Sequence, residues 1–346
     1  MARRLLHAAA AAAALGMLVA CSAGEPTPEA TSGDDLVAAA LAEGEVVVYS
    51  GQLDPTNEAI KAGFEAAYPG ITVRMAERMS TAATAQRIDA DVRTDGHIGA
   101  DIIIAISDQA LVTYLADEEL TRPVSASEFG VDEQFQYGPN AVAQAVTAPV
   151  VGYNTEVLEA AGADPITSWD DLLQPELDGL IQIADPEGSA TWAGTWSIIY
   201  NDTTLGEDFI AGLAATGYQP VASATVGTEQ LVAKQAGVLL FTVPSQLQAA
   251  KDAGNPIEMW FPEDPAPATQ NYNVLPSGSD HPNAGRLLMQ WLYSTDGQST
   301  NVLQGAVPVI PDVPGALPLP DDFQGPPAPY KVQQDLPVIL QLLDWT

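Results

Sequence analysis

The sequence predicts an α/β fold with doubly wound parallel sheets, and three observations support this prediction. Strands rich in β-branched residues alternate with amphipathic helical segments along most of the chain. The chain has 346 residues, which favours two domains because single cores rarely grow beyond roughly 250–300 residues. Hydrophobic residues make up 47% of the sequence, so the chain is too apolar for intrinsic disorder despite a formal charge of −33.

The first α/β unit covers residues 45–115. Glu45–Ser50 is a β-branched run typical of a buried parallel strand, and Asp54-Pro55 then starts a helix that Pro69-Gly70 ends. Alternating apolar residues predict a second strand at 71–75. A helix from about 80 to 93, a third strand at 100–106 and a helix at 108–115 follow. This βαβαβ order predicts a parallel sheet.

Small and hydroxyl-bearing residues follow the strands of this unit. Ligands bind beyond the carboxyl ends of parallel strands, where helix N-termini also point. The candidates for ligand binding are Ser50, Gly51, Ser80, Thr81 and Ser107. Each hydroxyl is also explained as a helix cap, and only their repetition at one edge of the sheet favours a binding site.

The second α/β unit begins near residue 146. Strands are expected at 146–153, 180–184, 238–243 and 257–261, and helices at 156–161, 169–173, 191–200, 229–236 and 245–252. A proline-containing loop then leads to an extended segment at 272–275 and to an amphipathic helix at 283–294. The proline-rich residues 308–329 predict an extended surface segment, and 332–343 predict a final helix.

The N-terminus is typical of a secretory signal. Met1–Arg4 is positively charged and Ala8–Ala20 is apolar but too short to span a bilayer, which takes ~20 residues. The four residues that end in Cys21 resemble the bacterial lipobox, whose cysteine is lipidated; the alternative is an ordinary signal with a chance cysteine. We expect a signal peptide at 1–20 and a lipidated flexible tether at 21–35, so that an extracytoplasmic protein is attached to the cell membrane by its lipid alone.

Seven stretches of the chain carry a family resemblance. They are VVVYSGQLD at 46–54, GADIII at 99–104, VVGYNTEVL at 150–158, SWDDLLQPELDGLIQIADPEGS at 168–189, AGVLLF at 236–241, AGNPIEMWFPEDPAP at 253–267 and HPNAGRLLMQWLYSTDGQ at 281–298. Their order resembles that of bacterial extracellular solute-binding proteins with the type II periplasmic-binding fold. The nearest branch is the one that holds ferric-iron, phosphonate, thiamine and sugar-phosphate binders, and the resemblance covers about residues 44–315.

The resemblance implies two lobes joined by a two-segment hinge. Lobe one would comprise 36–145 plus 272–346, and lobe two 146–271, with crossings near 145–150 and 268–273. The lobes would close on a small solute and deliver it to the membrane permease of an ABC importer, which is a change of population between open and closed forms. This function needs neither catalysis nor a cofactor, and a monomer is expected.

The resemblance and the predicted crossings add candidate ligand-binding residues in and beside lobe two. These are Tyr153, Asp185, Ser189, Trp192, Thr242 and Tyr272. Asp185 is explained as a helix cap or as a contact to a ligand amine, and Trp192 as cleft wall or as core. The two tyrosines are chosen because each follows a predicted crossing.

The sequence departs from the iron-binding members of the resembled family. Those members carry two adjacent tyrosines after the strand that corresponds to 237–241, where this sequence has Thr242-Val243-Pro244-Ser245-Gln246. Hydroxyl and amide groups supply no anionic ligands comparable with phenolates for the hard Fe³⁺ ion. We expect no direct binding of naked ferric iron and no protein-held metal, and a chelated metal stays open.

Basic residues are few, and four of them fall close together at Arg74, Arg78, Arg87 and Arg93. Arg78 precedes Ser80 at a predicted strand end, so it is either a bidentate grip for a carboxylate or phosphate or a surface residue that offsets the acidic field. Arg87 and Arg93 are expected to be solvated or paired with nearby aspartates. A grip by Arg78 favours an anionic or zwitterionic solute.

Other classes of function are weighed against this one. With 12 Lys+Arg against 45 Asp+Glu, non-specific nucleic-acid binding is excluded. No nucleophile elbow, zinc-protease motif or P-loop is present, and His97 and His281 are expected in exposed loops. The alternatives that remain are a secreted carboxylate-pair glycoside hydrolase and a structural surface lipoprotein.

Overall fold

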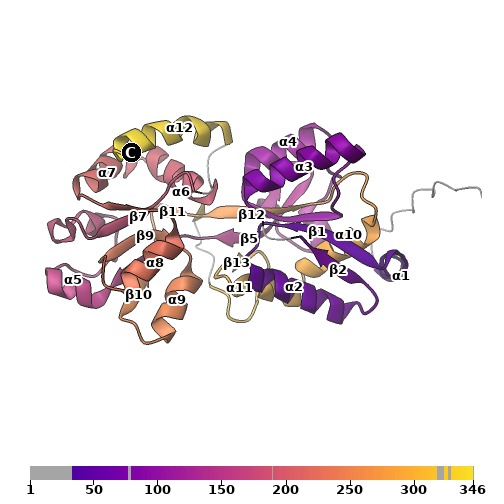
Figure 1. The fold of residues 1–346 in the computed structure, drawn as a ribbon, viewed down its shortest axis with the longest axis horizontal. Helices are drawn as coiled ribbons and strands as arrows, with labels where there is room; N and C mark the ends of the chain where they lie inside the picture. The colour runs from indigo at the N-terminus through magenta and orange to yellow at the C-terminus, as the bar shows by residue number, and fades with distance from the viewer. Residues whose placement is uncertain (1–32, 77–78, 189, 318–322, 326–328, 346) are drawn as a thin grey trace, which may run out of the picture.

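The structure, a computed structural model, describes residues 33–76, 79–188, 190–317, 323–325 and 329–345. Two α/β lobes lie side by side and are joined by strands near the middle of the molecule (Figure 1). The lobe that contains β1 is called lobe one, and the other is called lobe two. The two-lobed α/β fold predicted from the sequence is confirmed.

Lobe one is built on a seven-stranded sheet in the order β13-β5-β12-β3-β1-β2, with β4 paired to β5. β1 pairs in parallel with β2 and β3, whereas β12 is antiparallel to both β3 and β5. The strands are β1 (Glu45–Ser50), β2 (Thr72–Met75), β3 (Ile102–Ile106), β4 (Gln136–Tyr137), β5 (Ala141–Thr147), β12 (Thr269–Val274) and β13 (Val307–Pro308). The helices are α1 (Gly33–Glu43), α2 (Asp54–Ala67), α3 (Thr81–Asp95), α4 (Gln109–Asp117), α10 (Pro282–Leu292) and α11 (Thr295–Val302), with 3₁₀ turns at Ala126–Phe129 and Glu133–Phe135.

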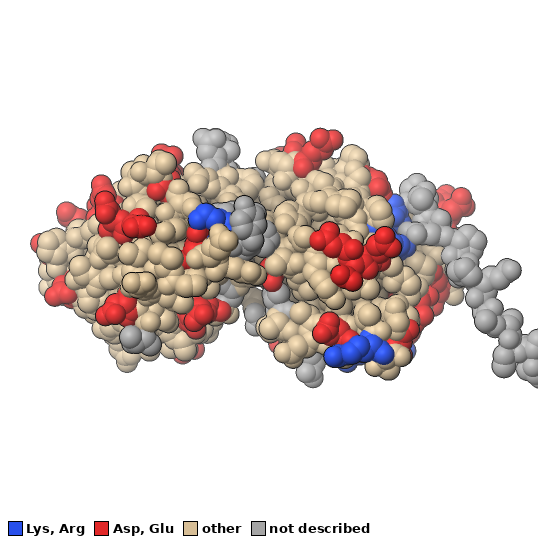
Figure 2. Space-filling model, turned by 90° about the horizontal axis from the view of Figure 1, so that it is seen from above, with Lys and Arg blue, Asp and Glu red and all other residues tan. Residues whose placement is uncertain are grey.

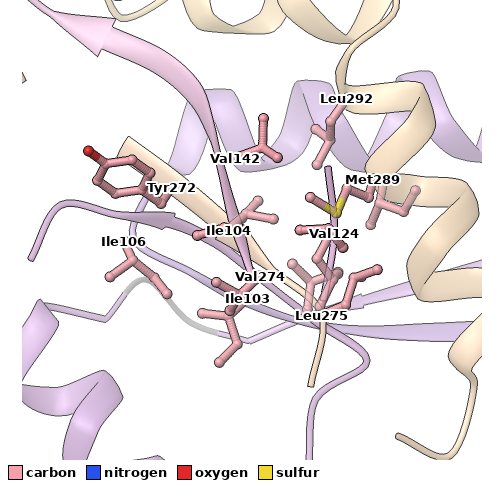
Figure 3. Close-up of a cluster of buried hydrophobic side chains, with 14 of the residues drawn as sticks. Ile103, Ile104, Ile106, Val124, Val142, Tyr272, Val274, Leu275, Met289 and Leu292 are labelled. Carbon is pink, nitrogen blue, oxygen red and sulfur yellow. The ribbon is translucent and has the colours of Figure 1, made fainter. Parts of the chain in front are cut away.

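The core of lobe one lies between this sheet and its helices. Isoleucines and valines of β3, β5 and β12 pack against Met289 and Leu292 of α10 (Figure 3). Tyr272 lies at one end of this group, with its hydroxyl directed away from the other labelled side chains (Figure 3). The continuous β-branched runs of the sequence therefore form the buried strands, as expected for a sheet covered on both faces.

Lobe two contains a five-stranded sheet in the order β10-β6-β9-β7-β8. Its strands are β6 (Val150–Asn154), β7 (Ile181–Ala184), β8 (Gln219–Val221), β9 (Val238–Thr242) and β10 (Ile257–Trp260). Its helices are α5 (Thr155–Ala161), α6 (Ala190–Asn201), α7 (Gly206–Ala215), α8 (Ala224–Val232) and α9 (Pro244–Asp252), with 3₁₀ turns at Asp170–Leu173 and Pro175–Leu177. β7 pairs in parallel with β8 and β9, while β6 is antiparallel to β9 and β10.

The chain passes between the two sheets at paired strands. It leaves lobe one from β5, crosses at Ala148 and Pro149, and enters lobe two at β6. It returns after β10 through β11 (Ala266–Pro267) into β12, which pairs with β5. The Asn271 amide donates to Thr147 Oγ1 at 2.9 Å, so a side-chain hydrogen bond also joins the two crossing strands. The first passage lies within the expected crossing at 145–150. The second lies mostly before the expected 268–273, because β12 already pairs with β5 from Thr269 onward.

The C-terminal helix departs from the expected division of the chain. The sequence analysis assigns all of 272–346 to lobe one, but α12 (Pro329–Leu342) packs against α6 and α7 of lobe two. Ile339 and Leu343 are buried in the core of lobe two. β14 (Phe323–Gln324) pairs with β11 on the way, so the chain meets the crossing region a third time. The apolar face of a helix does not specify which lobe covers it, and this is why the sequence assigned it wrongly.

Candidate functional site: a cleft between the lobes

A cleft of about 740 Å³ lies between the two lobes. The ends of β1 and β3 and the starts of α2, α3 and α4 line it from lobe one, together with Gln304 and Ala306. The starts of α6, α8 and α9 line it from lobe two. Thr147 and Asn271 of the crossing strands also line it. The cleft therefore forms where the carboxyl ends of both sheets face each other, as the rule for doubly wound sheets requires.

Several helix N-termini surround this cleft. Ser80 caps α3 by accepting from the Ala83 N–H at 3.2 Å, Asp108 caps α4 through Ala110 at 2.8 Å, and Ser223 caps α8. α2 and α9 start at Leu53 and Val243, which make no side-chain cap. Pro55 and Pro244 in their first turns have no N–H, and the N–H groups of Asn57 and Gln246 donate to the carbonyl oxygens of Leu53 and Val243. The remaining first-turn N–H groups are left to other partners, and each helix N-terminus carries roughly half a positive charge.

The charged side chains that line the described part of the cleft are Asp108 and Glu187. Most of the described cations are held elsewhere in ion pairs, among them Arg74 with Glu45 and Arg87 with Asp91. The expected pairing of Arg87 with a nearby aspartate is confirmed. Arg87 also donates to the Tyr49 hydroxyl, and burial together with the hydrogen bond to Asp91 raises the pKa of Tyr49 to about 12. These arginines therefore stabilise lobe one and do not reach the cleft.

Four of the residues proposed from the sequence line the cleft: Gly51, Ser80, Ser107 and Trp192. A Cβ at Gly51 would lie 2.6 Å from the carbonyl oxygen of Ala105, so only glycine permits this approach of β1 to β3. Trp192 is half-buried and packs on the core of lobe two while it lines the cleft. Trp192 is thus part of the cleft wall and part of the core packing at the same time.

Two of the proposed hydroxyl residues are enclosed in the lobes. Ser50 is 1% exposed and donates to Asn57 Oδ1 at 2.6 Å, which ties the end of β1 to α2. Thr242 is fully buried and lies within hydrogen-bond distance of Gln246 and Thr228. Neither lines the cleft, because each satisfies its hydroxyl inside its own lobe.

The two tyrosines proposed after the crossings also lie in the cores. The Tyr272 hydroxyl accepts from Gln109 Nε2 and donates to Gln270 Oε1, both at 2.9 Å, and its ring packs on Tyr137. Tyr153 belongs to the core of lobe two. Burial raises the pKa of both phenols, so both stay protonated. Alternation along β6 and β12 turns these side chains inward, and the crossing position alone does not reveal that direction.

The remaining proposed residues lie at helix starts. Asp185 accepts from the Glu187 N–H at 2.9 Å, which closes the turn that precedes α6, and it does not line the cleft. Thr81 is the first residue of α3. Arg78, Ser189 and Cys21 lie outside the described residues. Hence the structure does not place the proposed anion grip at Arg78.

Several cleft residues were not predicted from the sequence. They are Gln52, Thr147, Ser223, Thr225, Gln246, Asn271 and Gln304. Ser223 was missed because the helix that it caps was expected at 229–236, whereas α8 begins at Ala224. A serine followed by Ala224, Thr228 and Leu231 at helical spacing is the signal that could have placed it. Gln304 reaches the cleft from a segment more than 250 positions from Gln52 along the chain, which no local pattern records.

The structure offers little support for metal or histidine chemistry in the described residues. No group of three or more His, Cys, Asp or Glu side chains there could hold a metal ion. His281 is half-buried rather than exposed, because its ring Nδ1 lies 2.9 Å from the buried carboxylate of Asp101. His97 is also half-buried, with Nδ1 3.0 Å from the Ile98 carbonyl oxygen. Both expectations of exposed histidines were wrong. None of the described helices is long and apolar enough to cross a membrane.

Comparison with known proteins agrees with this geometry. Residues 49–299 match the family model described as bacterial extracellular solute-binding protein. The chain therefore belongs to that family. It is an extracytoplasmic solute-binding component of an ABC transporter, with a permease as its partner. No curated protein sequence matches the chain at a significant level.

Solved structures share the fold at low sequence identity. The periplasmic binding protein AfuA from Actinobacillus pleuropneumoniae is 20% identical, covers 87% of this chain and 99% of its own, and gives a TM-score of 0.68. A substrate-binding protein of an ABC transporter from Agrobacterium tumefaciens is 17% identical, with 86% and 94% covered and a TM-score of 0.71. Iron-bound HitA from Pseudomonas aeruginosa is 16% identical, with 86% and 99% covered and a TM-score of 0.68.

Proposed function

We propose that the cleft captures a small anionic or zwitterionic solute whose phosphate or carboxylate binds among the helix N-termini. The observation that carries this proposal is the meeting of helix starts from both lobes in one cleft, with α2 of lobe one and α9 of lobe two uncapped by a side chain. An anion between two such helices gains from both dipoles and from N–H donors. Such a solute bridges the lobes and favours the closed form.

A related structure supports this class of solute, and the tyrosine pair of iron binders has no counterpart here. The AfuA structure contains bound fructose-6-phosphate. HitA binds iron, but the cleft of this chain is lined by Val243 and Gln246 where the sequence analysis looked for tyrosines. We propose a solute that carries its own negative charge and polar groups.

The charge of the solute can be measured through Glu187. We expect Glu187→Gln to tighten binding of an anionic solute by roughly two- to five-fold, because it removes a negative charge at the cleft edge where salt screens part of the repulsion. A thermal-shift panel of fructose 6-phosphate, phosphonates, carboxylates, thiamine and polyamines selects the solute, since binding raises the melting temperature. Calorimetry then compares the affinities of the variant and the unchanged chain.

The matched control is Glu176→Gln, an exposed carboxylate of lobe two that does not line the cleft. It should leave the affinity unchanged. If Glu187→Gln weakens binding, or if only polyamines raise the melting temperature, the solute is a cation and the proposal is wrong. Turnover of a glycoside would favour the glycoside hydrolase instead. No change of melting temperature with any solute would favour the structural surface lipoprotein.

We also propose that Cys21 carries the lipid anchor and that the protein acts as a monomer. The lipobox-like residues before Cys21 support this, and the single cysteine leaves no intrachain disulfide role for it. In a bacterial host, Cys21→Ser is expected to move the protein from the membrane fraction to the soluble extracytoplasmic fraction. Ser22→Ala is the control, and retention of the Cys21→Ser variant in the membrane fraction would contradict the proposal.

A further inference from the structure

The two lobes touch beside the cleft at the loop that follows α11. Ser245, in the first turn of α9, donates from its hydroxyl to the carbonyl oxygen of Gln304 at 2.8 Å. A Cβ on Gly305 would lie 2.8 Å from Ser245 N and 3.3 Å from both Ser245 Cβ and Pro244 Cβ. Gly305 also has a φ of +73°, which favours glycine. The lobes therefore approach each other so closely here that a side chain at 305 would force a small shift of the backbone.

A network of side-chain amides holds the lobe-one half of this contact. Gln304 Nε2 donates to Gln52 Oε1 at 2.5 Å, and both side chains line the cleft. Gln52 Nε2 donates in turn to Asn301 Oδ1 at 3.4 Å, and Asn301 is fully buried. These hydrogen bonds restrain the side chains that they join. Gln304, whose carbonyl oxygen contacts lobe two, is thus held in place by Gln52, which also lines the cleft.

The same network reaches the first crossing strand. Gln144 of β5 donates to Asn301 Oδ1 at 3.2 Å, and its carbonyl oxygen accepts from Gln298 Nε2 at 3.0 Å. Gln144 lies where the register of β5 against β12 shifts by one residue, next to the hinge. Movement of the hinge strands is therefore connected by hydrogen bonds to the loop that touches Ser245.

We propose that Ser245 and the Gln304–Gly305 loop form a latch that stabilises the closed lobes, which makes Ser245 and Gly305 affinity-determining residues although neither lines the cleft. The latch contributes to the closed form whatever the solute is, because its partners are groups of the protein. The latch proposal rests on the proposed solute-binding function. It adds that Ser245 and Gly305 determine the residence time of the solute in the cleft.

Cross-linking tests the contact without a solute. In a Cys21→Ser background, Ser245→Cys with Gly305→Cys places two Cβ atoms 3.3 Å apart. A small shift of the loop that relieves the 2.8 Å contact with Ser245 N brings them into the range typical of disulfides, about 3.5–4.5 Å. Oxidised glutathione takes up the two electrons and two protons of the thiols and is reduced to two molecules of glutathione. We expect this pair to cross-link at least ten-fold faster than Ser245→Cys with Gly315→Cys. Gly315 has a similar φ of +75°, and a Cβ there would contact Val302 and nothing of lobe two.

Solute release gives the second readout. Ser245→Ala is expected to raise the dissociation rate of the best solute of the panel, with fructose 6-phosphate as first probe, by about five-fold, as suits one hydrogen bond. Ser299→Ala, which removes an exposed hydroxyl within α11, should not change that rate. Equal cross-linking of the two cysteine pairs would overturn the latch, and so would an unchanged release rate in Ser245→Ala. Failure of every anionic solute to bind would instead count against the proposed function. The cross-linking rates would still test the latch in that case, because they are measured without a solute.

Discussion

At the scale of single residues, the base of the cleft is shaped by one close backbone approach and by left-handed residues near the ends of two strands. The end of β1 reaches the carbonyl of Ala105 at Gly51, and Ala105 itself has a φ of 58°. Phe241 occupies the corresponding next-to-last position of β9 in lobe two and has a φ of 64°. These left-handed residues lie beside the register shifts of β12 and β6, so each lobe bends its central strand just before the cleft.

Gly51→Ala is therefore expected to disturb the cleft at its base. The added Cβ meets a carbonyl oxygen that belongs to a sheet strand and cannot move cheaply, so the free energy of unfolding should fall by about 1–3 kcal/mol. Chemical denaturation measures this change. Gly325→Ala is the control, since a Cβ there meets nothing within 4 Å, and a loss as large in Gly325→Ala would contradict the explanation.

Prediction from sequence worked for residues whose role is local. Ser80 and Ser107 were placed at the cleft because strand ends and helix caps can be recognised within a few residues. Tyr153 and Tyr272 were misplaced because the direction of a strand side chain depends on register, and one step reverses it. Gln304 was missed because its neighbour Gln52 lies in a distant part of the chain.

At the scale of elements, α12 shows how a helix is assigned to its lobe by polar contacts. Asp335 is 2% exposed and accepts from Ser197 Oγ at 2.5 Å and from Asn201 Nδ2 at 2.7 Å, both on α6. It also pairs with Lys331 of its own helix. The Tyr218 hydroxyl donates to the Leu343 carbonyl oxygen and adds a second polar contact near the C-terminus. These contacts hold α12 on lobe two although the chain arrives from lobe one.

The Asp335 carboxylate gives this docking a defined pH dependence. Burial opposes its charge, but hydrogen bonds from Lys331, Ser197 and Asn201 outweigh burial and lower the pKa of Asp335 below its usual 3.8. A carboxyl with a lowered folded pKa contributes its full stability above the unfolded pKa and loses it as the pH falls through the folded one. Docking of α12 should therefore be constant above about pH 5 and weaken below 3.8.

Asp335→Ala should loosen α12 at neutral pH, because it removes the acceptor of three hydrogen bonds. We expect a loss of about 2–3 kcal/mol, seen as faster amide hydrogen exchange in α12 and in the facing part of α6. Gln334→Ala, an exposed position on the same helix, is the control. Unchanged exchange in Asp335→Ala would show that apolar packing by Ile339 and Leu343 alone holds the helix.

The elements found from sequence are those with a pattern of their own. β1, β3, β7, β9 and helices α2, α3, α6 and α9 begin and end within a few residues of the predicted bounds. α1, α7, β8 and α11 were not predicted, and α8 was placed too late. α11 has the sequence TDGQSTNV, whose buried face is made of Gly, Gln, Thr and Asn, so no apolar periodicity marks it. The side-chain amides of Gln298 and Asn301 instead form hydrogen bonds with Gln144 of β5, and Asn301 also accepts from Gln52 at the cleft.

At the scale of the whole molecule, the charge is distributed rather than concentrated. Acidic side chains are spread over both lobes with few basic ones on the face that Figure 2 shows. Many of the described cations form ion pairs, so Arg74 and Arg87 balance local acids more than they attract ligands. A surface of this kind keeps the protein soluble through self-repulsion, which salt screens. Among the described residues, the cleft lining offers an anion the dipoles of helix N-termini and no basic side chain.

The placement of α12 also fixes where the two ends of the described chain lie. α1 belongs to lobe one, and the C-terminal helix ends over lobe two at the far side of the molecule (Figure 1). A donor fluorophore fused at one end and an acceptor at the other would thus be carried by different lobes. Their energy transfer would change as the lobes rotate, which makes this chain a scaffold for a fluorescent sensor of its own solute without any insertion into the cleft.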